Sequence, residues 1–114
     1  MTKERREFQR AELNIPMHYR RAGSMTTLWQ KGTLVDISAV GLRLATHESL
    51  EPDAKFEFEI VLPIRKNAYV LMGQVASEQV RQGQSEYGVA FIDLTYEKRA
   101  EIDELAQFLN KSNE

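Results

Sequence analysis

Along most of the chain, hydrophobic and polar positions alternate with a period of two. In the first such run, Leu13, Ile15, Met17 and Tyr19 fall on one side, with single residues of other types between them. Successive side chains of a strand point to opposite faces, so each alternating run predicts a strand with one buried face. The predicted strands lie at residues 13–20, 28–37, 42–44, 56–62, 69–80 and 87–91.

Turn-forming segments separate these runs and indicate the fold class. They are DISAVG (36–41), ESLEPD (48–53) and RQGQSE (81–86), and Pro63 should end the fourth strand. Gly32 is expected to mark a bend or bulge in the second strand. No helical pattern interrupts the strands, which favours an antiparallel sheet that closes into a barrel. The predicted fold is mainly β, a six-stranded antiparallel β-barrel over residues 11–94.

The period changes only near the end of the chain, where residues 95–110 predict an α-helix. Ile102, Leu105, Ala106 and Leu109 recur at the i, i+3, i+4 and i+7 spacing of an amphipathic helix. Thr95 is expected to be the N-cap. The apolar stripe suits a cap on the barrel and the seam of a homodimer equally well, so the oligomeric state stays open.

Length and composition set the bounds on these elements. A chain of 114 residues with 42% hydrophobic content fits a single domain, residues 1–114, with one core. No run reaches the roughly 18–20 apolar residues of a membrane span, and the first residues lack the apolar centre of a signal peptide. We therefore expect a cytoplasmic protein that does not engage a membrane.

Composition also excludes several kinds of chemistry. The chain has no cysteine, which excludes disulfides, a thiol nucleophile and a thiolate metal site. His18 and His47 are isolated from other metal ligands in the sequence, so no metal site and no cofactor are expected. Because no nucleophile, base and orienting group converge in the sequence, an enzyme is the least favoured class.

The distribution of charge points to one end of the molecule. The net charge is −2, which does not suit a nucleic-acid-binding domain. Residues 1–21 nevertheless carry six basic and three acidic side chains, whereas residues 97–114 carry three basic and five acidic ones. An anionic ligand is therefore expected at the N-terminal end.

Two short motifs carry the candidate chemistry. The first is RREFQR, which places Arg5, Arg6 and Arg10 before the first strand. A guanidinium group grips phosphate through paired N–H donors, bonds guanine O6 and N7 in the same way, and stacks on a base. Alone, this cluster would be a solvated basic tail.

The second motif is DISAVG, which alone would be an ordinary tight turn. Asp36 can accept hydrogen bonds from the N1 and N2 donors of guanine. Ser38 and the backbone around Gly41 can donate to a ribose or phosphate oxygen. The two motifs together therefore offer groups for every part of a guanine nucleotide.

Together, the two motifs resemble the cyclic di-GMP receptor signature of PilZ domains. The RxxxR pattern is met by Arg6 and Arg10, and the [D/N]xSxxG pattern by Asp36, Ser38 and Gly41. The resemblance covers nearly the whole chain, because YGVAFIDLTYEKRAEIDELAQFL is similar to the family's last barrel strand and C-terminal helix. It implies a PilZ-like split barrel whose residues 1–10 form a flexible arginine arm.

The resemblance also implies a role for each candidate residue. Arg6 and Arg10 would clamp cyclic di-GMP from the arm, while the Asp36, Ser38 and Gly41 motif would cradle it from the barrel. Arg43 matches a position where the family often has another ligand-contacting arginine. Arg5 precedes the motif, as in members that bind a stacked ligand dimer, so two ligands per chain are a further expectation.

The function implied is that of a non-enzymatic cyclic di-GMP effector. Ligand binding would change its conformation and regulate a bacterial output such as motility or biofilm formation through a partner protein that the sequence does not name. An alternative is a PilZ-fold interaction module that does not bind nucleotide. A barrel that binds single-stranded RNA is less favoured. It would need exposed aromatic residues on a basic strand face, whereas the aromatic residues of this sequence mostly fall on inward-facing positions.

Overall fold

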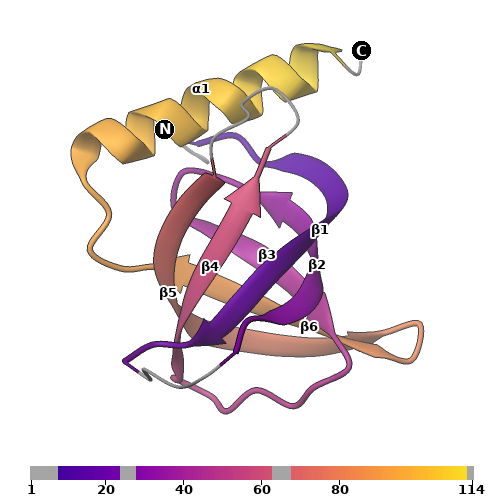
Figure 1. The fold of residues 1–114 in the computed structure, drawn as a ribbon. Helices are drawn as coiled ribbons and strands as arrows, with labels where there is room; N and C mark the ends of the chain where they lie inside the picture. Colours follow the sequence, from indigo (N-terminus) through magenta and orange to yellow (C-terminus); the bar gives the residue numbers. More distant parts are fainter. Residues whose placement is uncertain (1–7, 24–27, 63–67, 113–114) are drawn as a thin grey trace, which may run out of the picture.

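The computed structural model describes residues 8–23, 28–62 and 68–112. In this part of the chain, six strands are followed by one helix (Figure 1). The elements are β1 (Ala11–Arg21), β2 (Gln30–Ile37), β3 (Gly41–Thr46), β4 (Lys55–Val61), β5 (Ala68–Arg81), β6 (Gln84–Phe91) and α1 (Tyr96–Ser112).

The strands form a closed barrel in the order β1-β2-β3-β6-β5-β4. Every neighbouring pair is antiparallel, and β1 closes the barrel by pairing with β4 through His18 opposite Glu59 and Arg21 opposite Phe56. The predicted fold, a six-stranded antiparallel β-barrel with a C-terminal helix, is confirmed. The order places β3 beside β6, which joins residues 39 to 49 positions apart, from Thr46 opposite Ser85 to Gly41 opposite Ala90.

The alternating residues of the strands fill the barrel. In β4, Phe56, Phe58 and Ile60 are buried, and the residues between them are partly exposed. Tyr19, Leu34, Leu44 and Tyr87 complete the centre of the core at 1% exposure or less. Full burial of one such side chain contributes about 1.5–3 kcal/mol to folding, so the inward faces stabilise the barrel.

A buried polar cluster holds the loop after β3 against the barrel. The hydroxyl of Tyr19 lies 2.8 Å from Thr46 Oγ1 and donates to Glu48 Oε1 at 2.5 Å. The backbone N–H of Leu50 donates to the hydroxyl of Tyr87 at 3.0 Å. Burial, followed by the bond to Glu48, raises the pKa of Tyr19 to about 12. Tyr19 is therefore a neutral donor at physiological pH.

Irregularities in the strands lie at other positions than the sequence suggests. The β1–β2 register runs evenly through Gly32, so the bulge expected there is absent. A Cβ atom at Gly32 would lie 2.6 Å from Leu44 Cδ1, and the glycine lets the inner side chains approach. Register shifts instead occur between Glu12 and Ile15 and between Val75 and Ser77, where closure of the barrel bends the strands.

A further register shift, between Leu34 and Asp36, lies in β2 next to the second sequence motif.

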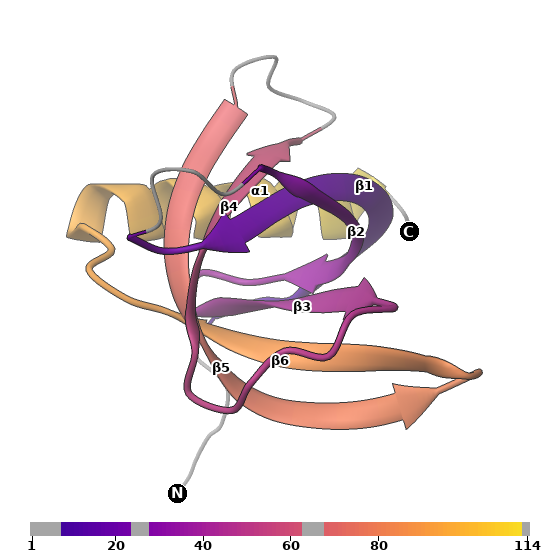
Figure 2. The same ribbon diagram turned by 60° about the horizontal axis from the view of Figure 1, so that its bottom comes forward.

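The β5–β6 connection is a tighter hairpin than the sequence suggests. Only Gln82 and Gly83 form the turn, with positive φ angles of 55° and 78°, so the six-residue turn predicted at 81–86 is wrong. Two residues with positive φ form a type I′ turn, which matches the twist of the flanking strands. The hairpin tip extends beyond the barrel in both views (Figures 1 and 2).

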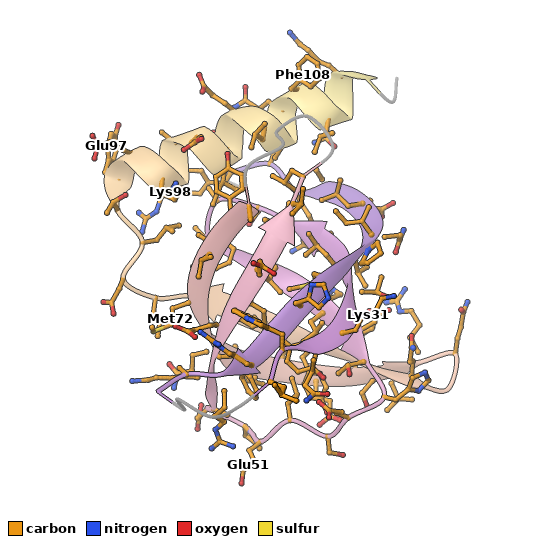
Figure 3. The ribbon with its side chains drawn as sticks, viewed as in Figure 1. Lys31, Glu51, Met72, Glu97, Lys98 and Phe108 are labelled. Carbon is orange, nitrogen blue, oxygen red and sulfur yellow. The ribbon has the colours of Figure 1, made fainter. Side chains whose placement is uncertain are left out.

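Helix α1 covers one end of the barrel. Thr95 Oγ1 accepts a hydrogen bond from the Lys98 N–H at 3.1 Å, which confirms the predicted N-cap. Ile102, Leu105 and Ala106 are buried, as the stripe predicts. Phe108 is 55% exposed and projects from the side of the helix away from the barrel (Figure 3). Among the described residues, no helix is long and apolar enough to cross a membrane.

Candidate ligand-binding site

The DISAVG segment forms a tight, well-bonded turn between β2 and β3. The Ser38 N–H donates to the Gly41 carbonyl at 2.9 Å, and the Val40 N–H donates to Ser38 Oγ at 3.3 Å. The Phe91 N–H donates to the Val40 carbonyl at 3.0 Å and ties the turn to β6. The turn therefore holds Ser38 in a fixed position at the barrel surface.

Gly41 has a packing role that the motif alone does not reveal. A Cβ atom at this position would lie 2.3 Å from the carbonyl oxygen of Val89. Real Cβ atoms do not approach a backbone oxygen so closely, so only glycine lets β3 begin against β6. Its expected role, a backbone that donates to a ligand, stays a prediction.

Asp36 lies between two arginines. Arg10 Nε is 3.9 Å from Asp36 Oδ1, and Arg43 Nε is 3.6 Å from Asp36 Oδ2. The Asp36 side chain is only 13% exposed, whereas that of Arg10 is 46% exposed. Both distances exceed a normal hydrogen bond, so the guanidinium groups are attracted to the carboxylate without committing their donors to it.

All described candidates line one open pocket of about 290 Å³ beside this turn. The candidates are Arg10, Asp36, Ser38, Gly41 and Arg43. They come from the segment before β1 and from the β2–β3 hairpin, where Asp36 lies at the end of β2, Ser38 in the turn and the other two in β3. Arg5 and Arg6 lie outside the described residues. The pocket thus combines cations, one carboxylate and a hydroxyl, which is the set of groups that the sequence predicts.

Sequence reasoning missed the wall of the pocket that β5 and β6 supply. Ala76 and Ser77 lie at the register shift in β5, opposite Gly88 of β6. A Cβ atom at Gly88 would lie 2.4 Å from Ser77 Oγ, so the glycine makes room for the hydroxyl. A glycine inside a strand pattern is the available signal, because it often marks a bulge or a close approach.

The segment before β1 also contacts α1. The Gln9 N–H donates to Asp103 Oδ1 at 3.4 Å. Asn110 Nδ2 donates to Gln9 Oε1 at 3.0 Å and to the Arg10 carbonyl at 3.1 Å. Asp103 and Asn110 are seven residues apart and share one helix face. The same segment therefore connects the pocket with the helix.

Trp29 and the two histidines noted in the sequence lie away from this pocket. Trp29 is partly exposed, and the Arg20 guanidinium carbon lies 4.2 Å from its ring centroid, so Trp29 packs on the outside of the barrel. His18 Nδ1 is 3.8 Å from Glu59 Oε1, and His47 bonds Gln84. Among the described residues, no cluster of three or more histidine, cysteine or acidic side chains could hold a metal ion.

The sequence also matches the model of a known protein family. The family model for the PilZ domain matches residues 4–108. The chain belongs to the PilZ domain family. A comparison with curated proteins finds no match. The resemblance carried by the two motifs is therefore confirmed at the level of the family.

Solved PilZ structures share this fold at low sequence identity. The inhibitor of motility MotI/DgrA from Bacillus subtilis superposes with a TM-score of 0.79 at 10% identity, over 96% of this chain and 53% of that protein. YcgR from Escherichia coli in complex with c-di-GMP gives 0.79 at 13% identity, over 96% and 48% of the two chains. This PilZ-family chain spans about half the length of these two proteins.

A separate structure of the YcgR PilZ domain from Escherichia coli, also with c-di-GMP, matches more evenly in length. Its TM-score is 0.71 at 16% identity, over 96% of this chain and 95% of that domain. At such identities the superposition shows a common fold. It does not by itself carry the ligand over.

Proposed function

We propose that this PilZ protein is a receptor for cyclic di-GMP that binds the ligand in the pocket beside the β2–β3 turn. One observation carries the proposal: Arg10 meets Asp36, Ser38, Gly41 and Arg43 in a single pocket, although it lies before β1 and the other four lie in the β2–β3 hairpin. The similar fold of YcgR, solved with c-di-GMP, supports the choice of ligand.

Each group in the pocket has a task in this proposal. The donors of Arg10 and Arg43 bind phosphate oxygens or the O6 and N7 atoms of guanine, because these guanidinium groups are not fully bonded to protein. Asp36 accepts from guanine N1 and N2. Ser38 keeps its hydroxyl hydrogen for the ligand, since its oxygen already accepts from Val40.

The energies are compatible with a reversible signal. A charge-assisted hydrogen bond contributes about 1.5–3 kcal/mol, and several form per ligand. Closure of the arm would order its backbone at a cost of about 1–2 kcal/mol per residue, and this cost reduces the free energy gained on binding. The remaining binding free energy is compatible with about −8 kcal/mol, which corresponds to a micromolar dissociation constant.

Output would pass through the N-terminal arm and a partner protein. The segment that holds Arg10 in the pocket also bonds Asp103 and Asn110 of α1. Capture of Arg10 by a ligand would change this contact and offer a partner an altered surface. We propose a non-enzymatic, cytoplasmic effector that controls a bacterial output such as motility or biofilm formation. If Arg5 contributes as the family resemblance implies, two stacked ligands bind per chain.

Calorimetric titration with cyclic di-GMP tests the proposal. We expect micromolar binding by the parent chain and at least a hundredfold loss in Arg10→Ala, because truncation removes a charged donor from the pocket. Arg21→Ala is the matched control, since Arg21 pairs with Glu51 outside the pocket and should leave affinity unchanged. GTP in place of cyclic di-GMP should give no heat.

Failure of the titration has a clear meaning. A folded parent chain that does not bind cyclic di-GMP would favour the alternative, a PilZ-fold interaction module without nucleotide binding. Equal affinity of the Arg10→Ala variant and the parent would remove Arg10 from the site while leaving ligand binding intact.

A further inference from the structure

The outer part of the β5–β6 hairpin has one unpaired edge. Pairing of β5 with β4 ends at Gln74, whereas its pairing with β6 continues to Arg81 opposite Gln84. On the β4 side, the last backbone bonds join Val75 to Asp53 and Ala54, at 3.1 and 2.9 Å. Within the described residues, the segment Ser77–Arg81 thus pairs with a strand on one side only, and the hairpin stands clear of the barrel (Figure 2).

The hairpin geometry decides which backbone groups face this edge. A two-residue turn makes the flanking pair, Arg81 and Gln84, a hydrogen-bonded pair. Hydrogen-bonded and non-bonded pairs alternate, so Val80 and Glu78 form non-bonded pairs with β6. Their N–H and C=O groups therefore point away from β6, toward the free edge.

The edge has little of the usual protection against pairing. Natural edge strands often carry lysine, proline or an inward charge, but Val80 is 71% exposed and the segment has neither lysine nor proline. The one carboxylate on this face is held back over its own hairpin. Glu78 Oε2 accepts from the hydroxyls of Tyr87 at 3.2 Å and Ser85 at 3.3 Å.

We propose that a second copy of this chain pairs with this edge, antiparallel about a twofold axis at Gln79. Glu78 then lies opposite the partner's Val80, and Val80 lies opposite the partner's Glu78. These are the residues whose backbone groups face the edge. Each such pair exchanges two bonds, so the four free groups of each copy are all satisfied in four hydrogen bonds.

Other registers are less favourable. Pairing of Glu78 with the partner's Glu78 would oppose two like charges. Pairing of Val80 with the partner's Val80 would place Glu78 opposite a turn residue, the partner's Gln82, which has positive φ and cannot continue a strand. The edge therefore fits a second copy in one register.

The proposed register also brings the two copies together at the pocket. On the outer face, Ser77 lies opposite the partner's Arg81. Ser77 lines the pocket, and Arg81 is 60% exposed, with Nε 3.7 Å from Glu86 Oε1. Each copy would thus extend a guanidinium group to the rim of the other copy's pocket.

Sedimentation of the full chain without ligand tests the pairing and is independent of the proposed function. The edge is short compared with a stable interface of about 1,200 Å² or more, so we expect a weak dimer with a dissociation constant on the order of 100 μM. Val80→Pro removes an N–H that the hairpin does not use and should abolish the dimer. Val80→Thr keeps that N–H and should preserve the dimer.

Two charge variants test the register and guard against a proline variant that does not fold. Val80→Lys places a cation opposite the partner's Glu78 and should tighten the dimer roughly threefold to tenfold, whereas Val80→Glu should weaken it by a similar factor. If both charges weaken the dimer, the register is wrong. Phe108→Ser, on the exposed face of α1, should have no effect.

A chain that stays monomeric up to about 1 mM would overturn the proposal, as this exceeds the expected dissociation constant tenfold. So would a dimer that survives in Val80→Pro, or one that Phe108→Ser abolishes, because its interface would then lie elsewhere. Circular dichroism establishes that each variant retains the barrel.

Discussion

Two carboxylates at the barrel surface are held in contrasting ways. Glu48 accepts a bond of 2.5 Å from the buried Tyr19 hydroxyl, within a cluster that includes Thr46. Asp36 instead lies 3.6 and 3.9 Å from two arginine nitrogens that border an open pocket. The short contact, made by the hydroxyl of a buried tyrosine, fixes a loop. The long, partly exposed contacts leave donors and acceptors available, and the difference separates groups that hold the fold from groups to which we assign the proposed ligand.

Gly41 belongs to both groups, because it lines the pocket and also lets β3 pack against β6. We expect Gly41→Ala to lower the free energy of unfolding by about 3 kcal/mol, since its Cβ would lie 2.3 Å from the Val89 carbonyl oxygen. Gly88→Ala is the matched comparison, because there the added atom meets the movable Ser77 hydroxyl. Urea unfolding of both variants should show the larger loss at Gly41, and equal losses would refute the packing role.

Alkaline titration should sharpen the contrast at the buried cluster. The pKa of Tyr19 is raised to about 12 in the folded chain, from 10.0. The unfolded chain therefore loses this proton first, and stability falls as pH rises from 10 to 12, by about 2–3 kcal/mol. Thermal unfolding across this range measures the slope, which should be smaller in Tyr19→Phe. An unchanged slope in that variant would assign the effect to other groups.

At neutral pH, Tyr19→Phe removes the hydroxyl that serves Thr46 and Glu48. We expect a loss of about 1–2 kcal/mol in the free energy of unfolding, because the buried Thr46 hydroxyl loses a partner and Glu48 loses a donor. Affinity for cyclic di-GMP should not change. Tyr96→Phe, at an 83% exposed position, is the control for loss of a hydroxyl and should leave stability unchanged.

The same contrast explains what could be predicted from the sequence. Strand periodicity, the Thr95 cap and the two motifs are local patterns. The structure bears out the strands and the cap, and it places Arg10 beside Asp36, whereas the ligand roles of the motifs stay predictions. Local patterns do not specify which strands become neighbours. The position of β3 beside β6 brings Ser77 to the pocket, and no spacing in the sequence indicates that pairing.

The contacts between the N-terminal segment and α1 could not be predicted from the sequence either. Gln9 and Asp103 are 94 residues apart, and their contact depends on how α1 covers the barrel. Gly32 illustrates the opposite difficulty. The sequence shows a glycine within a strand, but a glycine can serve a bulge or a close approach, and only the position of Leu44 decides between them.

The smallest effect on stability is expected at Asp36. There the contrast predicts that ligand binding weakens while the fold is retained. In Asp36→Asn, long ion pairs at the rim of a pocket contribute little, so the free energy of unfolding should change by less than about 0.5 kcal/mol. Affinity for cyclic di-GMP should nevertheless fall about tenfold, because the amide replaces one of the two acceptor oxygens with an NH2 donor, which opposes a donor of the guanine edge. Glu57→Gln is the control. Arg20 Nε lies 2.8 Å from Glu57 Oε1, and this pair lies outside the pocket, so the change should leave affinity unchanged. If Asp36→Asn binds as tightly as the parent, Asp36 does not read the guanine edge, and its role is limited to holding the two arginines.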